Sequence, residues 1–165
     1  MTPEPRHLPI VPSYGAAALG DLSSSLLASL DPEAPSAQNV LGLPPARRAC
    51  LLIVDGLGWE LLRDHPAAAP FLSELARNSR PITAGFPSTT VTSLGSICTG
   101  RPPGQHGILG YQVAIPGENR LLNGLRWDAR VDPLQWQPLP TVYERPLPRA
   151  SRPCTWPRAR SAAPA

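Results

Sequence analysis

Lysine is absent from this sequence of 165 residues, so arginine supplies the basic side chains behind a formal net charge of +3. A protein that binds the phosphate backbone of a nucleic acid needs a basic stripe on a folded face. Much of the arginine lies instead in a Pro/Ala/Ser-rich C-terminal stretch, at Arg145, Arg149, Arg152, Arg158 and Arg160. We therefore expect no nucleic-acid partner, and a nucleic-acid arm is kept only as an alternative for this stretch.

Cysteine and long apolar runs are also scarce. Cys50, Cys98 and Cys154 are widely separated and form no CxxC pair, which argues against a disulfide framework and a cysteine zinc site. The most apolar early stretch, residues 22–30, is short, is interrupted by serines and follows Asp21 without a basic segment. These features exclude a signal peptide and a transmembrane helix in that stretch. We expect a soluble, cytoplasmic protein with no membrane partner.

Proline, by contrast, is abundant. The chain has 23 prolines, which is about three times the usual share of roughly 5%. They crowd the two ends, whereas residues 49–132 have a composition compatible with strands and helices. We therefore predict an extended lead-in over residues 1–13, one domain over residues 14–145 and a Pro/Arg/Ala-rich disordered tail over residues 146–165.

The spacing of apolar residues predicts alternating helices and strands in the central region. Apolar residues recur at helical spacing between residues 16 and 30, and Pro32 ends this helix. Residues 50–54 form a continuous apolar run, which is typical of a strand buried on both faces of a parallel sheet. The next predicted elements are helix, helix, strand and helix, over residues 59–63, 70–77, 81–84 and 90–99. This order predicts an α/β fold whose site lies beyond the carboxyl ends of the strands.

Asp55 stands where the predicted strand over residues 50–54 ends in a turn that contains Gly56 and Gly58. A carboxylate at such a strand end can face a ligand while the strand holds its backbone, which makes Asp55 a candidate metal ligand. Asp-Gly pairs are also common in ordinary turns, where aspartate caps the next helix and glycine supplies the turn dihedral angles. The local sequence leaves both interpretations open.

Thr90 lies at the predicted start of a helix, where free backbone N–H groups and the helix dipole favour a bound anion such as phosphate. Its hydroxyl is a weak nucleophile at neutral pH and needs a base or a metal ion to activate it. Asp55 is a candidate to hold that metal. Ser and Thr clusters also serve as ordinary helix caps, and Ser88, Thr89 and Ser93 surround Thr90 in the sequence. Both a nucleophile and a capping role stay open.

Three short motifs occur in order along the chain. Asp-Gly follows the apolar run at residues 55–56, Phe-Pro-Ser-Thr-Thr occupies residues 86–90, and Pro-Gly-Gln-His-Gly occupies residues 103–107. Together they resemble the phosphodiesterase/nucleotide pyrophosphatase branch of the alkaline phosphatase superfamily, over about residues 51–145. The resemblance implies that residues 14–145 are the N-terminal part of an alkaline phosphatase-like domain, an α/β sheet with flanking helices.

The resemblance also implies roles for individual residues. Thr90 would be the nucleophile that forms a phosphothreonine intermediate, and Asp55 and the Thr90 oxygen would bind one of two divalent metal ions, usually zinc. The substrate would be a small phosphoester such as a nucleotide. Ser93 stands where better-known members have a phosphate-binding asparagine, and His106 is expected in a structural turn rather than among the metal ligands.

The chain departs from this family pattern in its ligand count. No histidine follows His106 and no acidic residue follows Glu144, whereas two catalytic zinc ions need roughly six ligands. We therefore expect the chain to be inactive alone. Because the sequence after Arg145 changes abruptly to a low-complexity composition, we also predict a frameshift or truncation near Arg145. The alternative function is a non-catalytic remnant that binds phosphate or a nucleotide.

Overall fold

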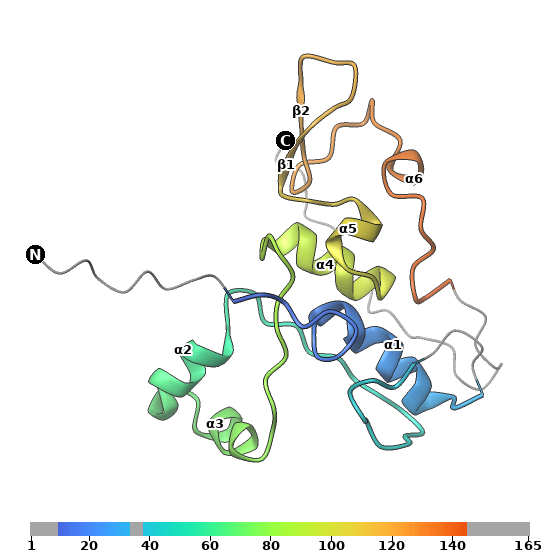
Figure 1. Cartoon of the computed structure of the whole chain (residues 1–165). Helices are drawn as coiled ribbons and strands as arrows, with labels where there is room; N and C mark the ends of the chain where they lie inside the picture. Colours follow the sequence, from blue (N-terminus) through green and yellow to red (C-terminus); the bar gives the residue numbers. More distant parts are fainter. Residues whose placement is uncertain (1–9, 34–37, 145–165) are drawn as a thin grey trace, which may run out of the picture.

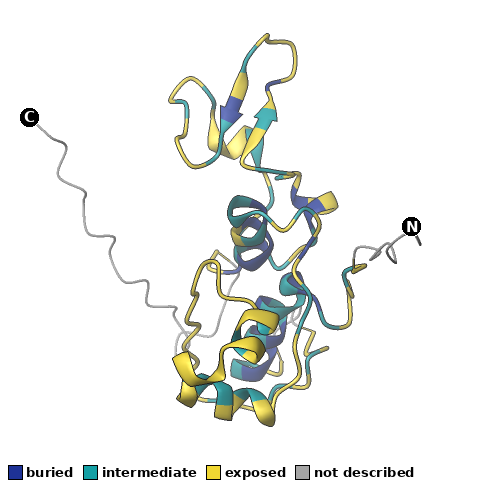
Figure 2. Cartoon of the chain, turned by 90° about the vertical axis from the view of Figure 1, so that its left-hand side faces the viewer, coloured by how far each residue is buried: buried dark blue, intermediate teal, exposed yellow. Residues whose placement is uncertain are grey.

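Two helices form the centre of the molecule. The computed structural model describes residues 10–33 and 38–144. Helices α1, Leu19–Leu30, and α4, Thr90–Thr99, pack side by side (Figure 1). Figure 2 shows that the buried residues gather on these two helices. The two helices predicted in these regions are therefore confirmed.

The contact between α1 and α4 depends on small and polar residues of α1. The Ser23 hydroxyl donates a hydrogen bond to the carbonyl oxygen of Ile97, and both residues are buried. A Cβ atom on Gly20 would lie 3.0 Å from the carbonyl carbon of Arg101, which follows the end of α4, so two backbone segments pass closely here. The leucines that define the helical periodicity are only half-buried, at Leu19, Leu22, Leu26 and Leu30.

The remaining helices are short, and several begin with proline, whose fixed φ suits the first helical position. They are α2 (Trp59–Asp64), the 3-10 helix η1 (Pro66–Ala68), α3 (Pro70–Arg77), α5 (Pro103–His106) and α6 (Pro133–Trp136). Helix α3 begins and ends at the predicted residues. Neither α2 nor α3 contains a buried residue (Figure 2). No helix in the described ranges is long and apolar enough to cross a membrane.

The predicted buried strand over residues 50–54 is wrong. These residues form no strand and are exposed, and the side chain of Leu52 is 76% exposed. A strand requires a neighbour that takes up its backbone hydrogen bonds, and no described residue makes a backbone hydrogen bond to residues 50–54. The strand predicted over residues 81–84 is reduced to one isolated parallel bridge, between Thr83 and Ala18.

A small antiparallel hairpin completes the described chain. Strand β1, Gln112–Ala114, pairs with β2, Leu121–Asn123, in a register that places Val113 opposite Leu122. Leu122 is buried, and Gly117 turns the hairpin with a φ of 77°. The described residues thus combine helices with a two-stranded sheet, an arrangement compatible with part of an α/β fold.

Some predictions fall outside the described residues. They concern most of the lead-in, the tail over residues 146–165, the proposed break near Arg145 and the state of Cys154. Cys50 and Cys98 are free thiols.

Candidate functional site

Asp55 and Thr90 lie together although 35 residues separate them in the sequence. The Thr90 hydroxyl lies 3.2 Å from one carboxylate oxygen of Asp55 and 3.3 Å from the other, within hydrogen-bond distance. Asp55 is exposed in a turn that Gly56 closes with a φ of 74°, a conformation that glycine adopts at little cost. Thr90 is half-buried at the first position of α4. The pair therefore meets at the N-terminal end of a helix.

Thr89, rather than Thr90, caps this helix. Its hydroxyl oxygen accepts a hydrogen bond from the backbone N–H of Thr92, at 3.4 Å, and pairs with the Thr92 hydroxyl at 2.9 Å. Thr92 is fully buried. Capping therefore occupies Thr89 and Thr92, while the Thr90 hydroxyl is directed to Asp55.

Ser93 follows Thr90 by three residues, a spacing that places two side chains on one face of a helix. The residue is half-buried, and its backbone N–H donates to the carbonyl oxygen of Thr89 at 2.9 Å. Its hydroxyl has no hydrogen-bond partner within residues 10–33 and 38–144. Ser93 therefore follows Thr90 at helical spacing with a hydroxyl that is unpaired among the described residues, and its contact with a phosphate stays a prediction.

His106 lies away from this pair, at the end of α5. Its side chain is 2% exposed. The backbone N–H of Ile108 donates to its Nδ1 atom at 3.1 Å, so the neutral ring carries its proton on Nε2. Nε2 lies 3.0 Å from the Ser96 hydroxyl oxygen, to which it donates. Burial lowers the pKa of His106 below its ordinary value, which favours this neutral form.

This lowered pKa predicts that acid destabilises the chain. The unfolded state takes up a proton on His106 near pH 6.5, whereas the folded state does so only at lower pH. The contribution of His106 to stability is therefore complete above about pH 6.5 and is lost as the pH falls toward the folded-state pKa. Between pH 7.5 and 5.5 we expect a loss of at most about 1.4 kcal/mol, measured by urea unfolding.

The control for this pH effect is His106→Gln, because glutamine keeps an N–H donor for Ser96 without titrating. We expect the pH-dependent loss to shrink in this variant and to persist in His65→Gln, which changes an exposed histidine. Equal losses in wild type and His106→Gln would contradict the assignment.

A turn after β2 packs against the start of α4, a contact that no sequence motif predicted. A Cβ atom on Gly124 would lie 2.7 Å from Cγ1 of Val91, the residue after Thr90. Backbone N–H groups of Leu125 and Gly124 donate to the Asn123 side chain and to the carbonyl oxygen of Tyr111, respectively. The Asn-Gly pair was the available signal, because this dipeptide is common in turns.

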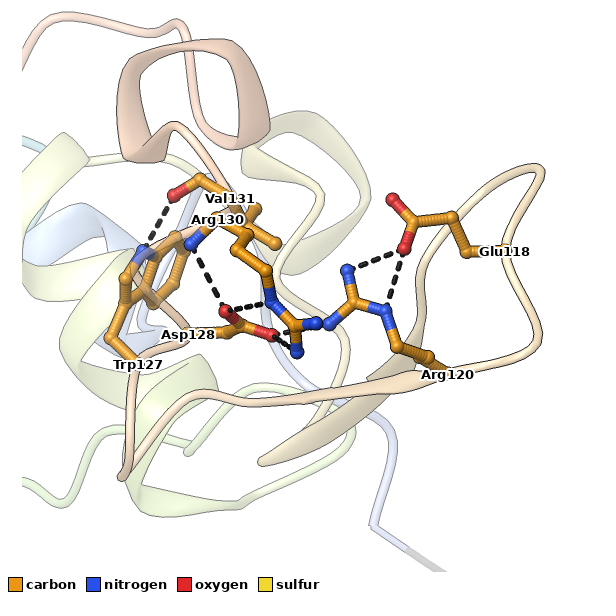
Figure 3. Close-up of polar contacts among 6 residues, drawn as sticks. All are labelled: Glu118, Arg120, Trp127, Asp128, Arg130 and Val131. Atoms are coloured by element: carbon orange, nitrogen blue, oxygen red, sulfur yellow. Dashed lines mark hydrogen bonds and ion pairs between the residues drawn. The ribbon is translucent and has the colours of Figure 1, made fainter.

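Asp128, to which the sequence gave no role, organises the loop beyond the hairpin (Figure 3). Arg130 contacts both oxygens of its carboxylate, at 2.9 and 2.7 Å, and Arg120 binds the same group. These cations hold the pKa of Asp128 well below its ordinary value, with the Arg130 hydrogen bonds contributing most. Arg120 also pairs with Glu118. Because two arginines meet two carboxylates, their charges balance and the cluster fixes the loop rather than attracting an anion.

The donor set does not fit a complete catalytic zinc site. Asp55 and Thr90 supply a carboxylate and a hydroxyl oxygen, whereas a catalytic zinc ion takes about three protein ligands. No group of three or more His, Cys, Asp or Glu side chains that could hold a metal ion occurs in the described part of the chain.

Comparisons with known proteins identify the family. No curated protein and no solved structure matches the chain. The family model described as type I phosphodiesterase / nucleotide pyrophosphatase matches residues 49–160, which is more than half of the chain and includes Asp55, Thr90 and Ser93. This family lies within the alkaline phosphatase superfamily, is generally metal-dependent and acts on small phosphoesters such as nucleotides. The chain therefore belongs to the type I phosphodiesterase / nucleotide pyrophosphatase family.

Proposed function

We propose that this chain carries the nucleophile of a metal-dependent phosphodiesterase, with Thr90 as the attacking residue. The observation that supports this most directly is the contact between the Thr90 hydroxyl and the Asp55 carboxylate, at 3.2 and 3.3 Å. The two residues come from separate motifs, and the contact does not serve helix capping, which Thr89 performs. An oriented hydroxyl at a helix N-terminus suits attack on a phosphate ester.

In the proposed reaction the Thr90 oxygen forms a bond to phosphorus, the P–O bond to the leaving group breaks, and the Thr90 proton is transferred overall to the leaving oxygen, which departs as an alcohol. Water then cleaves the phosphothreonine and restores the hydroxyl. Asp55 orients the Thr90 hydroxyl by accepting its hydrogen bond, and the backbone N–H groups at the start of α4 favour the phosphate charge. Ser93 is proposed to donate a hydrogen bond to a phosphate oxygen.

We propose that Asp55 and the Thr90 oxygen belong to one of two zinc sites, in the N-terminal part of an alkaline phosphatase-like domain. A zinc ion would supply charge stabilisation and would favour the alkoxide form of the nucleophile. Because two donors do not complete such a site, we expect the isolated chain not to turn over phosphodiesters. His106 is proposed as a structural residue, since its ring nitrogens already bind Ile108 and Ser96.

Zinc binding tests the proposed site. Asp55→Ala should weaken zinc binding by about tenfold or more, because it removes the carboxylate from the two donors, Asp55 and Thr90, that the chain supplies. Thr90→Ala should cause a smaller loss, since a hydroxyl is a weaker ligand than a carboxylate. Isothermal titration calorimetry and elemental analysis of the purified chain measure both effects.

Asp64→Ala is the matched control, because Asp64 is an exposed carboxylate whose side chain is 63% accessible. Its removal should leave zinc binding unchanged. Equal zinc affinity in wild type, Asp55→Ala and Asp64→Ala would contradict the metal role of Asp55.

A non-catalytic phosphate site is the second candidate, and the small donor set favours it. In that case inorganic phosphate would bind without zinc and without hydrolysis, and Asp55→Ala would not weaken it.

A further inference from the structure

The loop that leads to Thr90 is held by a tyrosine from the beginning of the described chain. The backbone N–H of Phe86 donates a hydrogen bond to the Tyr14 hydroxyl oxygen at 2.9 Å, across 72 positions of sequence. Phe86 opens the Phe-Pro-Ser-Thr-Thr motif that ends at Thr90. The Tyr14 hydroxyl is therefore bonded to the same loop that carries the proposed nucleophile.

The backbone next to this bond is fixed by Thr83. Its N–H donates to the carbonyl oxygen of Ala17, and its carbonyl oxygen accepts from the N–H of Leu19, both at 2.8 Å. Its hydroxyl oxygen also accepts from the N–H of Ser13 at 2.8 Å. Residues 13–19 thus follow the loop closely from Thr83 to Phe86.

The loop has little room to move on its other side. A Cβ atom on Gly85 would lie 3.0 Å from the ring of Pro103 and 3.6 Å from the Tyr14 hydroxyl. Pro103 is buried at the start of α5. Gly85 is therefore enclosed between Tyr14 and Pro103, and loss of the Tyr14 hydroxyl would open one side of this enclosure.

We infer that Tyr14 is a positioning residue, which acts through the Phe86 N–H to hold Thr90 against Asp55. The inference rests on the proposed function, because Thr90 must face Asp55 for the site to work. No other described acceptor binds the Phe86 N–H. Without the Tyr14 hydroxyl, the Phe86 N–H would bond to water, and the loop would lose this fixed contact. A displacement of about 1 Å at a reacting group can reduce a rate by a hundredfold.

The test is a nuclear magnetic resonance measurement on the full chain with labelled threonine methyl groups. In the wild-type background, Asp55→Asn should shift the Thr90 methyl resonance, because the two side chains are in contact. In a Tyr14→Phe background the same change should produce a shift smaller by about half or more, as expected for coupled sites. An equal shift in both backgrounds would overturn the inference.

Tyr111→Phe is the matched control. Tyr111 is 49% exposed and Tyr14 is 43% exposed, and the Tyr111 hydroxyl makes no hydrogen bond to any residue that the structure describes. This variant should leave the effect of Asp55→Asn on Thr90 as in wild type. A reduced shift in Tyr111→Phe as well would also overturn the inference, because any lost tyrosine hydroxyl would then suffice.

A zinc titration separates this inference from the proposed function. Tyr14→Phe should weaken zinc binding by up to about tenfold, the equivalent of one hydrogen bond, and should have no further effect in a Thr90→Ala background. The same loss in both backgrounds would indicate that Tyr14 acts on the whole fold and would overturn the inference. Absence of zinc binding in wild type would contradict the metal role of the site, whereas the Thr90 resonance would still decide the role of Tyr14.

Discussion

Replacing His106 with alanine should lower the free energy of unfolding by about 4 kcal/mol. The ring is one of the largest fully buried side chains, and its removal leaves a cavity beside α4. It also removes the partners of the Ser96 hydroxyl and of the Ile108 N–H. Since small domains are stable by only about 5–15 kcal/mol, this one change should consume much of the stability.

Urea unfolding followed by circular dichroism measures this effect. His65→Ala is the control, because that histidine is exposed and should change stability by less than about 0.5 kcal/mol. His106→Gln should lie between the two, since it retains a donor for Ser96. If His106→Ala and His65→Ala were equally stable, His106 would not be the packing residue that its burial implies.

Valine in place of Gly95 should have the second-largest effect, a loss of about 3 kcal/mol. A Cβ atom at this position would lie 2.9 Å from Cε1 of His106 and 3.2 Å from a methyl carbon of Ile108. The buried His106 ring cannot move aside without losing its hydrogen bonds to Ser96 and Ile108. The added volume therefore has to push α4 away from α5.

Gly104→Val is the matched control for Gly95→Val, because a Cβ atom on Gly104 would meet nothing within 4 Å.

The stability losses caused by His106→Ala and Gly95→Val should also depend on each other. In a His106→Ala background, Gly95→Val should cost much less than in wild type, because the cavity accepts the new side chain. Additive losses would show that the two residues do not press on each other.

The elements that the sequence predicted well are those defined by local signals. Helix α3 begins at Pro70, whose fixed φ favours the first helical turn. Helix α4 lies between the cap at Thr89 and Gly100, which ends the helix with a φ of 63°. Neither signal depends on contacts with distant parts of the chain.

The strand prediction over residues 50–54 failed because a strand is defined by its neighbour as much as by its own side chains. The continuous apolar run over residues 50–54 favoured a strand, but no described segment pairs with it. The buried face of α1 was hidden for a related reason. Ser23 bonds to Ile97 of α4, and Gly20 lies against the backbone of Arg101 just after α4. Such close contacts require small or polar residues, and these give no apolar periodicity.

The sequence predicted the two motif residues of the candidate site, but not the residues that contact the Thr90 region from elsewhere in the chain. The motifs pointed to Asp55 and Thr90, and the structure places their side chains in contact, while their chemical roles stay proposals. No motif marks the Tyr14 hydroxyl, and the Asn-Gly pair at residues 123–124 indicates a turn but not its contact with Val91. Such contacts arise only when the chain is folded.

The exposed segment over residues 50–54 has a consequence for the cost of ligand binding. Residues 50–54 make no backbone hydrogen bond to another described residue, and backbone of this kind has low local stability. Asp55 therefore follows a loosely held segment and not a strand fixed in a sheet. Ordering each backbone residue costs about 1–2 kcal/mol in entropy. The free energy gained when a cation binds Asp55 must offset this entropy cost. We therefore expect a lower cation affinity than the same carboxylate would have on a fixed backbone.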